Sequence, residues 1–166
     1  MKQKILLIFV LFTISLFGQF KAHKDGFIIK MESEQNKNVI CYFILFYNES
    51  KKNDTFIIVD INLAETNKPT KINFNTLNGN LSIPCETHAG KVIVGYIEAD
   101  KRHSISFWDD ETIRKILYSL ASKDTCFIQI HTQDTFYNFD FTKYNDKMKE
   151  NKTYNDAMTR LIYNTK

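Results

Sequence analysis

The tightest cluster of chemically reactive residue types in the sequence is Cys85-Glu86-Thr87-His88. A thiolate and an imidazole at this spacing could supply two ligands to a metal ion such as zinc, with His103 or His131 as a further candidate ligand. The same pair could instead form a thiolate nucleophile next to a base. A lone C-x-x-H lacks the second ligand pair that a zinc site usually has. We therefore expect a structural role here and keep a small metal-binding or Cys/His-dependent enzyme, centred on Cys85 and His88, as the alternative.

Three consecutive carboxylates, Asp109, Asp110 and Glu111, are the other residues that could do acid-base chemistry. Carboxylates at this position also suit the start of a helix, because they accept hydrogen bonds from its first amides and oppose the positive end of its dipole. The sequence contains no glycine-rich phosphate loop, no G-x-S-x-G elbow and no H-E-x-x-H motif. We therefore expect neither a catalytic set nor a cofactor.

The three cysteines, Cys41, Cys85 and Cys126, all fall on the predicted inward faces of strands. In an oxidising compartment, one disulfide and one free thiol would be the natural arrangement. Three reduced cysteines that pack as small hydrophobic residues are the alternative, because free cysteine is among the most buried residue types. The spacing does not decide which pair would form.

Residues 1–18 have the pattern of a secretory signal peptide. Lys2 and Lys4 form the basic region, and residues 5–17 form an apolar run that is short of the roughly 20 residues needed to span a bilayer. Gly18 is a small residue at a plausible cleavage position, with Ala22 as a second one. We expect residues 19–166 to form one exported globular domain, periplasmic or extracellular, with no stable membrane anchor after cleavage.

Loss of residues 1–18 would lower the formal net charge from +3 to +1, because it removes Lys2 and Lys4. Acidic and basic residues are interspersed along the remaining chain. A nucleic-acid binder usually carries a basic stripe, so nucleic acid is not an expected partner. A protein partner in the cell envelope is the expectation that remains.

The elements that must position these residues are organised around the stretch 103–141. Residues 103–108 alternate as a half-buried strand does, and Ile113, Ile116, Leu117 and Leu120 then recur at helical spacing. Such an apolar stripe predicts an amphipathic helix that packs on a sheet. Residues 125–131 and 136–141 are predicted to return as two strands, with His131 at a solvated strand end.

Before this stretch, alternating or continuous apolar residues predict strands at 26–33, 38–48, 56–63, 72–76, 81–85 and 91–98. The stretch 38–48 is apolar on both faces, which is typical of a central strand. Asn78-Gly79 predicts a tight hairpin between its neighbours. Thr153 and Asp156 resemble a capping box that opens a C-terminal helix. These elements predict an α+β fold, mainly an antiparallel sandwich-like sheet with one mid-chain amphipathic helix and a helical C-terminus.

Phe136 is predicted to lie on the sheet face opposite to Tyr137, Phe139 and Phe141, beside polar neighbours. We expect the C-terminal helix to cover that face, because helices rarely leave an apolar sheet face open. If the helix does not cover it, the aromatic ring would belong to a patch available to a partner.

From about residue 105 onward, the order is strand, helix, strand, strand, followed by Phe139-Asp140-Phe141-Thr142-x-Tyr144 and then Met148. This stretch resembles the C-terminal part of small exported bacterial β-rich proteins of the invasion-associated locus B type and the type VI secretion accessory lipoprotein type. The chain differs from them in having Lys143 where they usually have glycine, and in lacking their N-terminal paired cysteines and a lipidation cysteine. The resemblance implies an exported, non-enzymatic domain in which Phe139, Asp140 and Tyr144 are structural positions.

Overall fold

The computed structural model describes residues 20–48, 54–76, 79–86, 92–121 and 125–163 of the 166-residue chain. The described chain is α+β, as the sequence predicted, with two antiparallel sheets and a helical C-terminus. The larger sheet contains, in spatial order, β1 (Phe20–His23), β2 (Gly26–Glu32), β3 (Ile40–Asn48), β4 (Asp54–Ile61), β8 (Arg102–Phe107) and β7 (Val92–Ile97). The smaller sheet contains β10 (Phe136–Asp140), β9 (Cys126–His131), β5 (Lys71–Thr76) and β6 (Gly79–Pro84).

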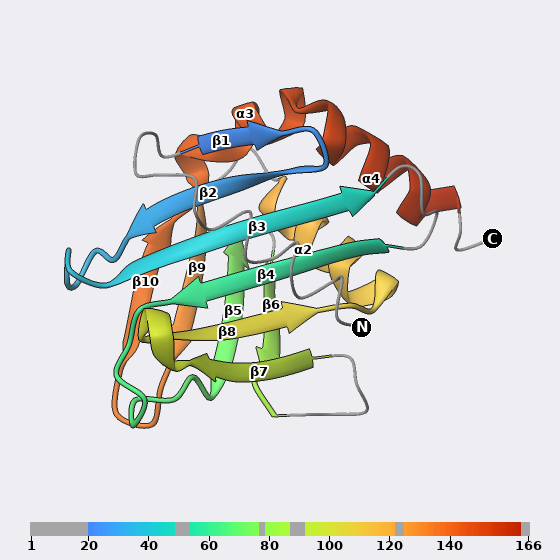
Figure 1. Ribbon diagram of the computed structural model, residues 1–166. Coiled ribbons are helices and arrows are strands. Elements are labelled where there is room, and N and C mark those ends of the chain that lie inside the picture. Colours follow the sequence, from blue (N-terminus) through green and yellow to red (C-terminus); the bar gives the residue numbers. More distant parts are fainter. Residues whose placement is uncertain (1–19, 49–53, 77–78, 87–91, 122–124, 164–166) are drawn as a thin grey trace.

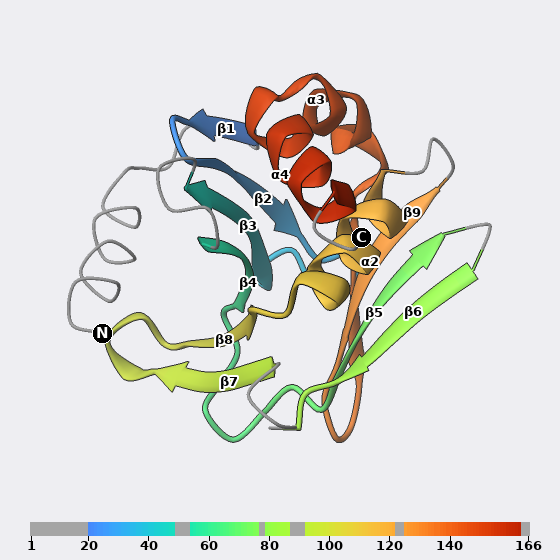
Figure 2. The ribbon, with the colours of Figure 1, turned by 90° about the vertical axis from the view of Figure 1, so that its right-hand side faces the viewer.

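The two sheets lie face to face, and the strands of the smaller sheet run at a steep angle to those of the larger one (Figure 1). Helices α2 (Asp110–Leu120), α3 (Asn145–Glu150) and α4 (Lys152–Tyr163) lie along one side, where the sheets diverge (Figure 2). One hydrophobic core includes residues from both sheets and from all three of these helices. The predicted sandwich is therefore closed on this side by helices.

The predicted central strand 38–48 is confirmed by β3, which pairs with β2 on one side and β4 on the other. Its inward residues Phe43 and Leu45 belong to the main core. Its outward residues Ile44 and Phe46 belong to a second, smaller cluster on the outer face of the larger sheet. On that face the Phe46, Phe56 and Trp108 rings form a continuous stack, with centroids 4.7 and 4.6 Å apart.

Helix α2 begins as its sequence predicted. The Asp109 side chain accepts a hydrogen bond from the Thr112 backbone N–H at 2.9 Å, which satisfies an amide at the helix start. The four apolar residues at helical spacing are fully buried: Ile113, Ile116, Leu117 and Leu120. Helix α2 packs against β4, β5 and β6, so it joins the two sheets through this single face.

The C-terminal helix starts differently from the prediction. Thr153 is already inside α4 and is buried, and the Tyr154 backbone N–H donates to Asn151 Oδ1 instead. Arg160 on α4 forms an ion pair of 2.7 Å with Asp110 at the start of α2. Among the residues that the structure describes, no helix combines the length and hydropathy needed to cross a bilayer.

The edge strand β1 was not predicted from the sequence. It pairs with β2 from Phe20↔Ile29 to His23↔Gly26, and the Phe20 ring stacks on Phe27 with centroids 5.4 Å apart. The strand is too short to show an alternating pattern in the sequence, so its formation depends on its pairing with β2. Signal cleavage after Gly18 would leave β1 intact, whereas cleavage after Ala22 would remove most of it.

Gly26 marks the point where a side chain has no room. An ideal Cβ at this position would lie 2.1 Å from the Leu45 carbonyl oxygen, which belongs to the backbone of β3. We expect Gly26→Ala to lower the free energy of unfolding by about 1 to 3 kcal/mol, because two paired strands must move apart. Gly95→Ala is the control, since a Cβ there meets nothing within 4 Å. Denaturant titration of both variants tests this, and similar unfolding midpoints would contradict it.

Candidate functional site

The structure does not bring the alternative Cys/His site together within its described residues. Cys85 lies just after β6, is 5% exposed and belongs to the main core. His88 lies outside the described residues. His103 points inward from β8, with its Nε2 2.9 Å from the Ala64 carbonyl oxygen and its ring 4.9 Å from that of Tyr96. Within the described ranges, no group of three or more His, Cys, Asp or Glu residues could hold a metal ion.

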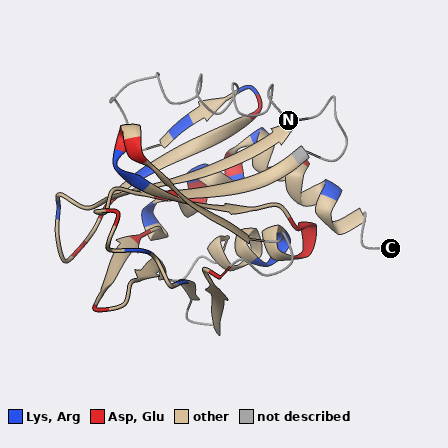
Figure 3. Cartoon of the chain, turned by 60° about the horizontal axis from the view of Figure 1, so that its bottom comes forward, with Lys and Arg blue, Asp and Glu red and all other residues tan. Residues whose placement is uncertain are grey.

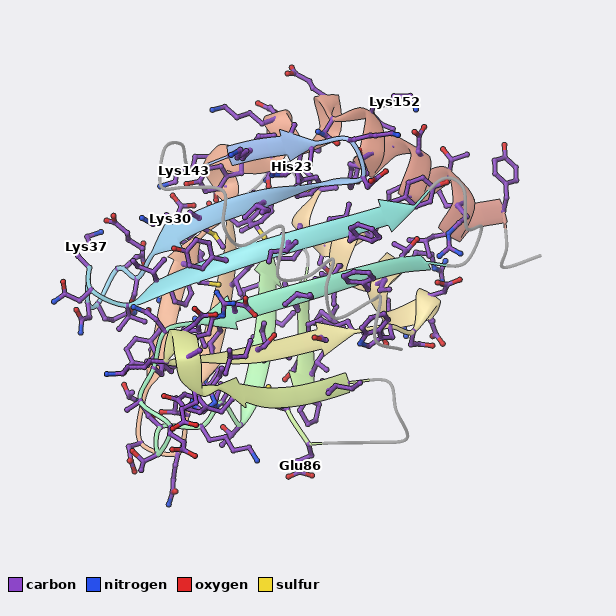
Figure 4. All side chains as sticks on the ribbon, viewed as in Figure 1. His23, Lys30, Lys37, Glu86, Lys143 and Lys152 are labelled. Carbon is purple, nitrogen blue, oxygen red and sulfur yellow. The ribbon has the colours of Figure 1, made fainter. Side chains whose placement is uncertain are left out.

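The chemistry of Cys85 also opposes a reactive role. Burial raises the pKa of its thiol to about 12, with Lys68 opposing that shift only in part. The thiolate is the reactive and metal-binding form, so at neutral pH this sulfur behaves as a small hydrophobic group. The neighbouring Glu86 side chain instead points outward, at the end of the molecule beyond β6 (Figure 4).

The other two cysteines are core residues as well. Cys41, Cys85 and Cys126 are all free and buried, which is the second of the two arrangements that the sequence left open. Burial raises the pKa of Cys126 to about 12, and the nearby Asp140 carboxylate adds to that shift. The three thiols therefore contribute packing.

The carboxylates before α2 have structural partners. Asp109 caps the helix, Asp110 pairs with Arg160, and Glu111 pairs with Lys115 at 2.7 Å on the exposed helix surface. The resemblance positions are likewise structural in this chain. Asp140 Oδ1 accepts from the Thr142 N–H at 2.9 Å, and the Tyr144 hydroxyl donates to the Lys30 carbonyl oxygen.

A different set of polar side chains gathers on the outer face of the smaller sheet. The strand registers Asn138↔Gln129, Gln129↔Asn73 and Asn73↔Ser82 place four polar residues in one row across all four strands. The inward neighbours in each strand, such as Ile128 and Phe74, are fully buried, which shows that the row faces away from the core. Strand spacing makes the row about 14 Å long.

Aromatic rings flank this row on both sides. The next row along the strands contains Phe136 opposite His131, with ring centroids 5.5 Å apart. The row on the other side contains Phe127, which is half-buried. We call the combined surface the amide face and define it by these residues: Asn73, Ser82, Phe127, Gln129, His131, Phe136 and Asn138.

Phe136 is 43% exposed, so the prediction that the C-terminal helix covers its face is wrong. Helix α4 packs instead on α2, α3, β2 and β3, because its apolar side chains fill the gap between the diverging sheets. The alternative stated for this outcome, a ring that belongs to an accessible patch, is the arrangement in the structure.

The middle of the amide face is electrically neutral. Desolvation lowers the pKa of His131, and the nearby Lys71 ammonium lowers it further, which favours the neutral imidazole. Its Nε2 lies 2.9 Å from Asn73 Nδ2 and accepts a hydrogen bond from that amide. Among the described residues, neither Asn73 Oδ1 nor Asn138 Oδ1 accepts a hydrogen bond. The fold encloses both oxygens, so the hydrogen-bonding groups of the central row that a ligand can reach are those of Gln129 and Ser82.

The frame under the amide face is held by contacts on its edge strand. The Asn138 backbone N–H donates to Gln35 Oε1 at 2.8 Å, and its carbonyl accepts from the Glu34 N–H at 2.9 Å. These bonds tie β10 to the segment that follows β2 in the other sheet. The side chains of the row thus project from a backbone that is paired on both sides of β10.

The sequence analysis placed Phe136 beside polar neighbours on one sheet face and His131 at a solvated strand end. It did not identify the row of polar residues that crosses the four strands. The only local signal is the alternation of Asn73, Asn75, Gln129 and Asn138 with apolar residues, which also occurs on any solvated strand face. Comparisons of the chain with protein families, with curated proteins and with solved structures found no match.

Proposed function

We propose that the chain is an exported, non-catalytic binding domain of a bacterial cell envelope, and that it contacts its partner through the amide face. The observation that carries this proposal is the exposed Phe136 ring beside a row of amides on a paired sheet. Exposed aromatic residues that border polar groups are enriched at binding surfaces.

Three further observations support the proposal. The apolar stretch 5–17 behind Lys2 and Lys4 favours export. The buried, protonated thiol of Cys85 disfavours the alternative of a Cys/His-dependent enzyme. Charges of both signs are interspersed over the described chain, which does not favour a nucleic-acid partner (Figure 3). The resemblance to exported β-rich proteins agrees with the proposal and stays a prediction.

The experiment follows the protein from export to binding. The full chain is produced with its own N-terminus, recovered from the periplasm and the medium, and weighed by intact-mass spectrometry. We expect a soluble species that lacks residues 1–18. Immobilised exported chain should then retain an envelope component, and Phe136→Ala should weaken that retention at least about fivefold, as truncation of an interface aromatic does.

Tyr118→Ala is the matched control, because Tyr118 is also an exposed aromatic, at 77%, but lies on α2. Retention that falls equally in both variants, or in neither, would contradict a role for the amide face. A soluble species that still carries residues 1–18 would contradict export.

A further inference from the structure

We infer that the amide face binds a neutral carbohydrate chain. The inference rests on the proposed function and names the ligand class of the same surface. Three features carry it: the donor and acceptor chemistry of the central row, the absence of charge in its middle among the described residues, and the aromatic rings on either side.

The central row matches the chemistry of sugar hydroxyls. Each side-chain amide offers both a donor and an acceptor, and a sugar hydroxyl can satisfy both. Gln129, in the middle of the row, makes no side-chain hydrogen bond to another residue that the structure describes. Asn73 and Asn138, on either side of it, are half-buried, and the fold encloses the side-chain oxygen of each. A ligand rich in hydroxyls could therefore pair with the Gln129 amide and with the exposed Ser82 hydroxyl.

The charge of the face argues against anionic ligands. Phosphate and nucleic-acid recognition rests on lysine and arginine contacts, whereas the row contains only amides and the Ser82 hydroxyl. Lys71 lies in the His131 row, and Asp140 lies in the Phe127 row, so the two nearest charges have opposite signs at opposite sides. A neutral, polar ligand fits this distribution.

A protein partner fits the middle of the face less well. Protein interfaces usually bury an apolar centre inside a polar rim, and the order here is reversed, with amides in the centre and rings at the sides. A peptide could add a strand to this sheet only at the β6 edge, because the β10 edge already bonds to Glu34 and Gln35, and such a peptide would lie beside the row and not on it. The faces of sugar rings, in contrast, are apolar and can lie on Phe136 and Phe127 while their hydroxyls reach the row.

The test uses the exported chain and a panel of named polysaccharides. Affinity gel electrophoresis is run with starch, mixed-linkage β-glucan, galactomannan and xyloglucan, and with alginate and heparin as charged counterparts. We expect retardation by at least one neutral polysaccharide and no preference for the charged ones. Calorimetry on the corresponding oligosaccharide should then show about tenfold weaker binding for Gln129→Ala, because the variant loses hydrogen bonds to the ligand.

Gln133→Ala is the matched control, because Gln133 is the same residue type on the exposed turn between β9 and β10. It should bind as the unmodified chain does. Ser82→Ala, on the exposed edge strand β6, serves as a second variant with little risk to folding, and we expect about threefold weaker binding. Thermal melting of each variant separates lost binding from lost folding.

Two outcomes would overturn the inference: no retardation by any neutral polysaccharide, or equal affinities for Gln129→Ala and Gln133→Ala. If a protein or peptide is retained through Phe136 while no polysaccharide binds, the ligand class is wrong and the proposed function stands. If Phe136→Ala and Tyr118→Ala retain the partner equally, the proposed function itself fails.

Discussion

Replacing Leu117 by alanine is expected to lower the free energy of unfolding by about 2 to 5 kcal/mol. Leu117 is fully buried on the face of α2 that packs against both sheets, so the truncation leaves a cavity at a point where three layers meet. The smaller value applies if neighbouring side chains relax into the cavity, and the larger one if the sheets hold them in place. Urea titration, monitored by tryptophan fluorescence, measures the change in the free energy of unfolding.

Lys115→Ala is the control on the opposite face of the same helix. Lys115 pairs with Glu111 at 2.7 Å, but both side chains are more than half exposed, so this ion pair contributes little. Its loss should change stability by less than about 0.5 kcal/mol. Comparable effects of the two substitutions would show that the apolar stripe of α2 does not form the joint between the sheets.

The second large effect concerns pH, because the fold buries a carboxyl group. Asp60 on β4 has a side chain that is 1% exposed, and Arg102 Nε lies 3.5 Å from its Oδ2. Desolvation raises the pKa of Asp60 to about 6, against opposing effects of Ser104 and Arg102, while Asp100 adds to the rise. In the unfolded chain an aspartate titrates near pH 3.9.

The folded state therefore holds the Asp60 proton more tightly than the unfolded state does. The stability that this proton provides is fully present below pH about 4 and is lost as the pH rises through about 6, by roughly 3 kcal/mol in all. Asp60→Asn carries no titrating group at this position. We expect the stability of the variant, relative to the unmodified chain, to rise by about that amount between pH 4 and pH 7.

Asp134→Asn is the matched control, because Asp134 is exposed in the turn between β9 and β10. The pH-dependent change measured for Asp60→Asn should exceed the change measured for Asp134→Asn over the same pH range. Urea titrations of the three proteins at several pH values supply the comparison. A constant difference between Asp60→Asn and the unmodified chain would show that the Asp60 carboxyl titrates normally in the folded state.

Some elements follow from the sequence because their signals are local. The i, i+3, i+4 spacing on α2 and the Asp109 cap lie within one segment, and the structure confirms both. The run that is apolar on both faces became β3. The strands on either side of the predicted hairpin, β5 and β6, are paired, and Gly79 is the first residue of β6, whereas Asn78 lies outside the described residues. Each of these patterns is a periodicity or turn preference that a short peptide already carries.

The candidate binding surface could not be found in this way. Its central row takes Asn73, Ser82, Gln129 and Asn138 from four strands, and only the register between the strands places them side by side. A shift of one residue in any strand would turn its polar side chain to the other face. Local alternation identifies which residues of a strand share a face, but not which strands are neighbours.

The sequence by itself determined the α+β class, the amphipathic helix, the central strand and the hairpin. Tertiary structure alone decided the pairing of β1, the course of α4, the exposure of Phe136 and the burial of Asp60. The physical reason is that periodicity acts within a segment, whereas coverage of a face depends on where distant segments pack. Helix α4 fills the gap between the diverging sheets because its apolar side is buried there, and this placement leaves the outer face of the smaller sheet open.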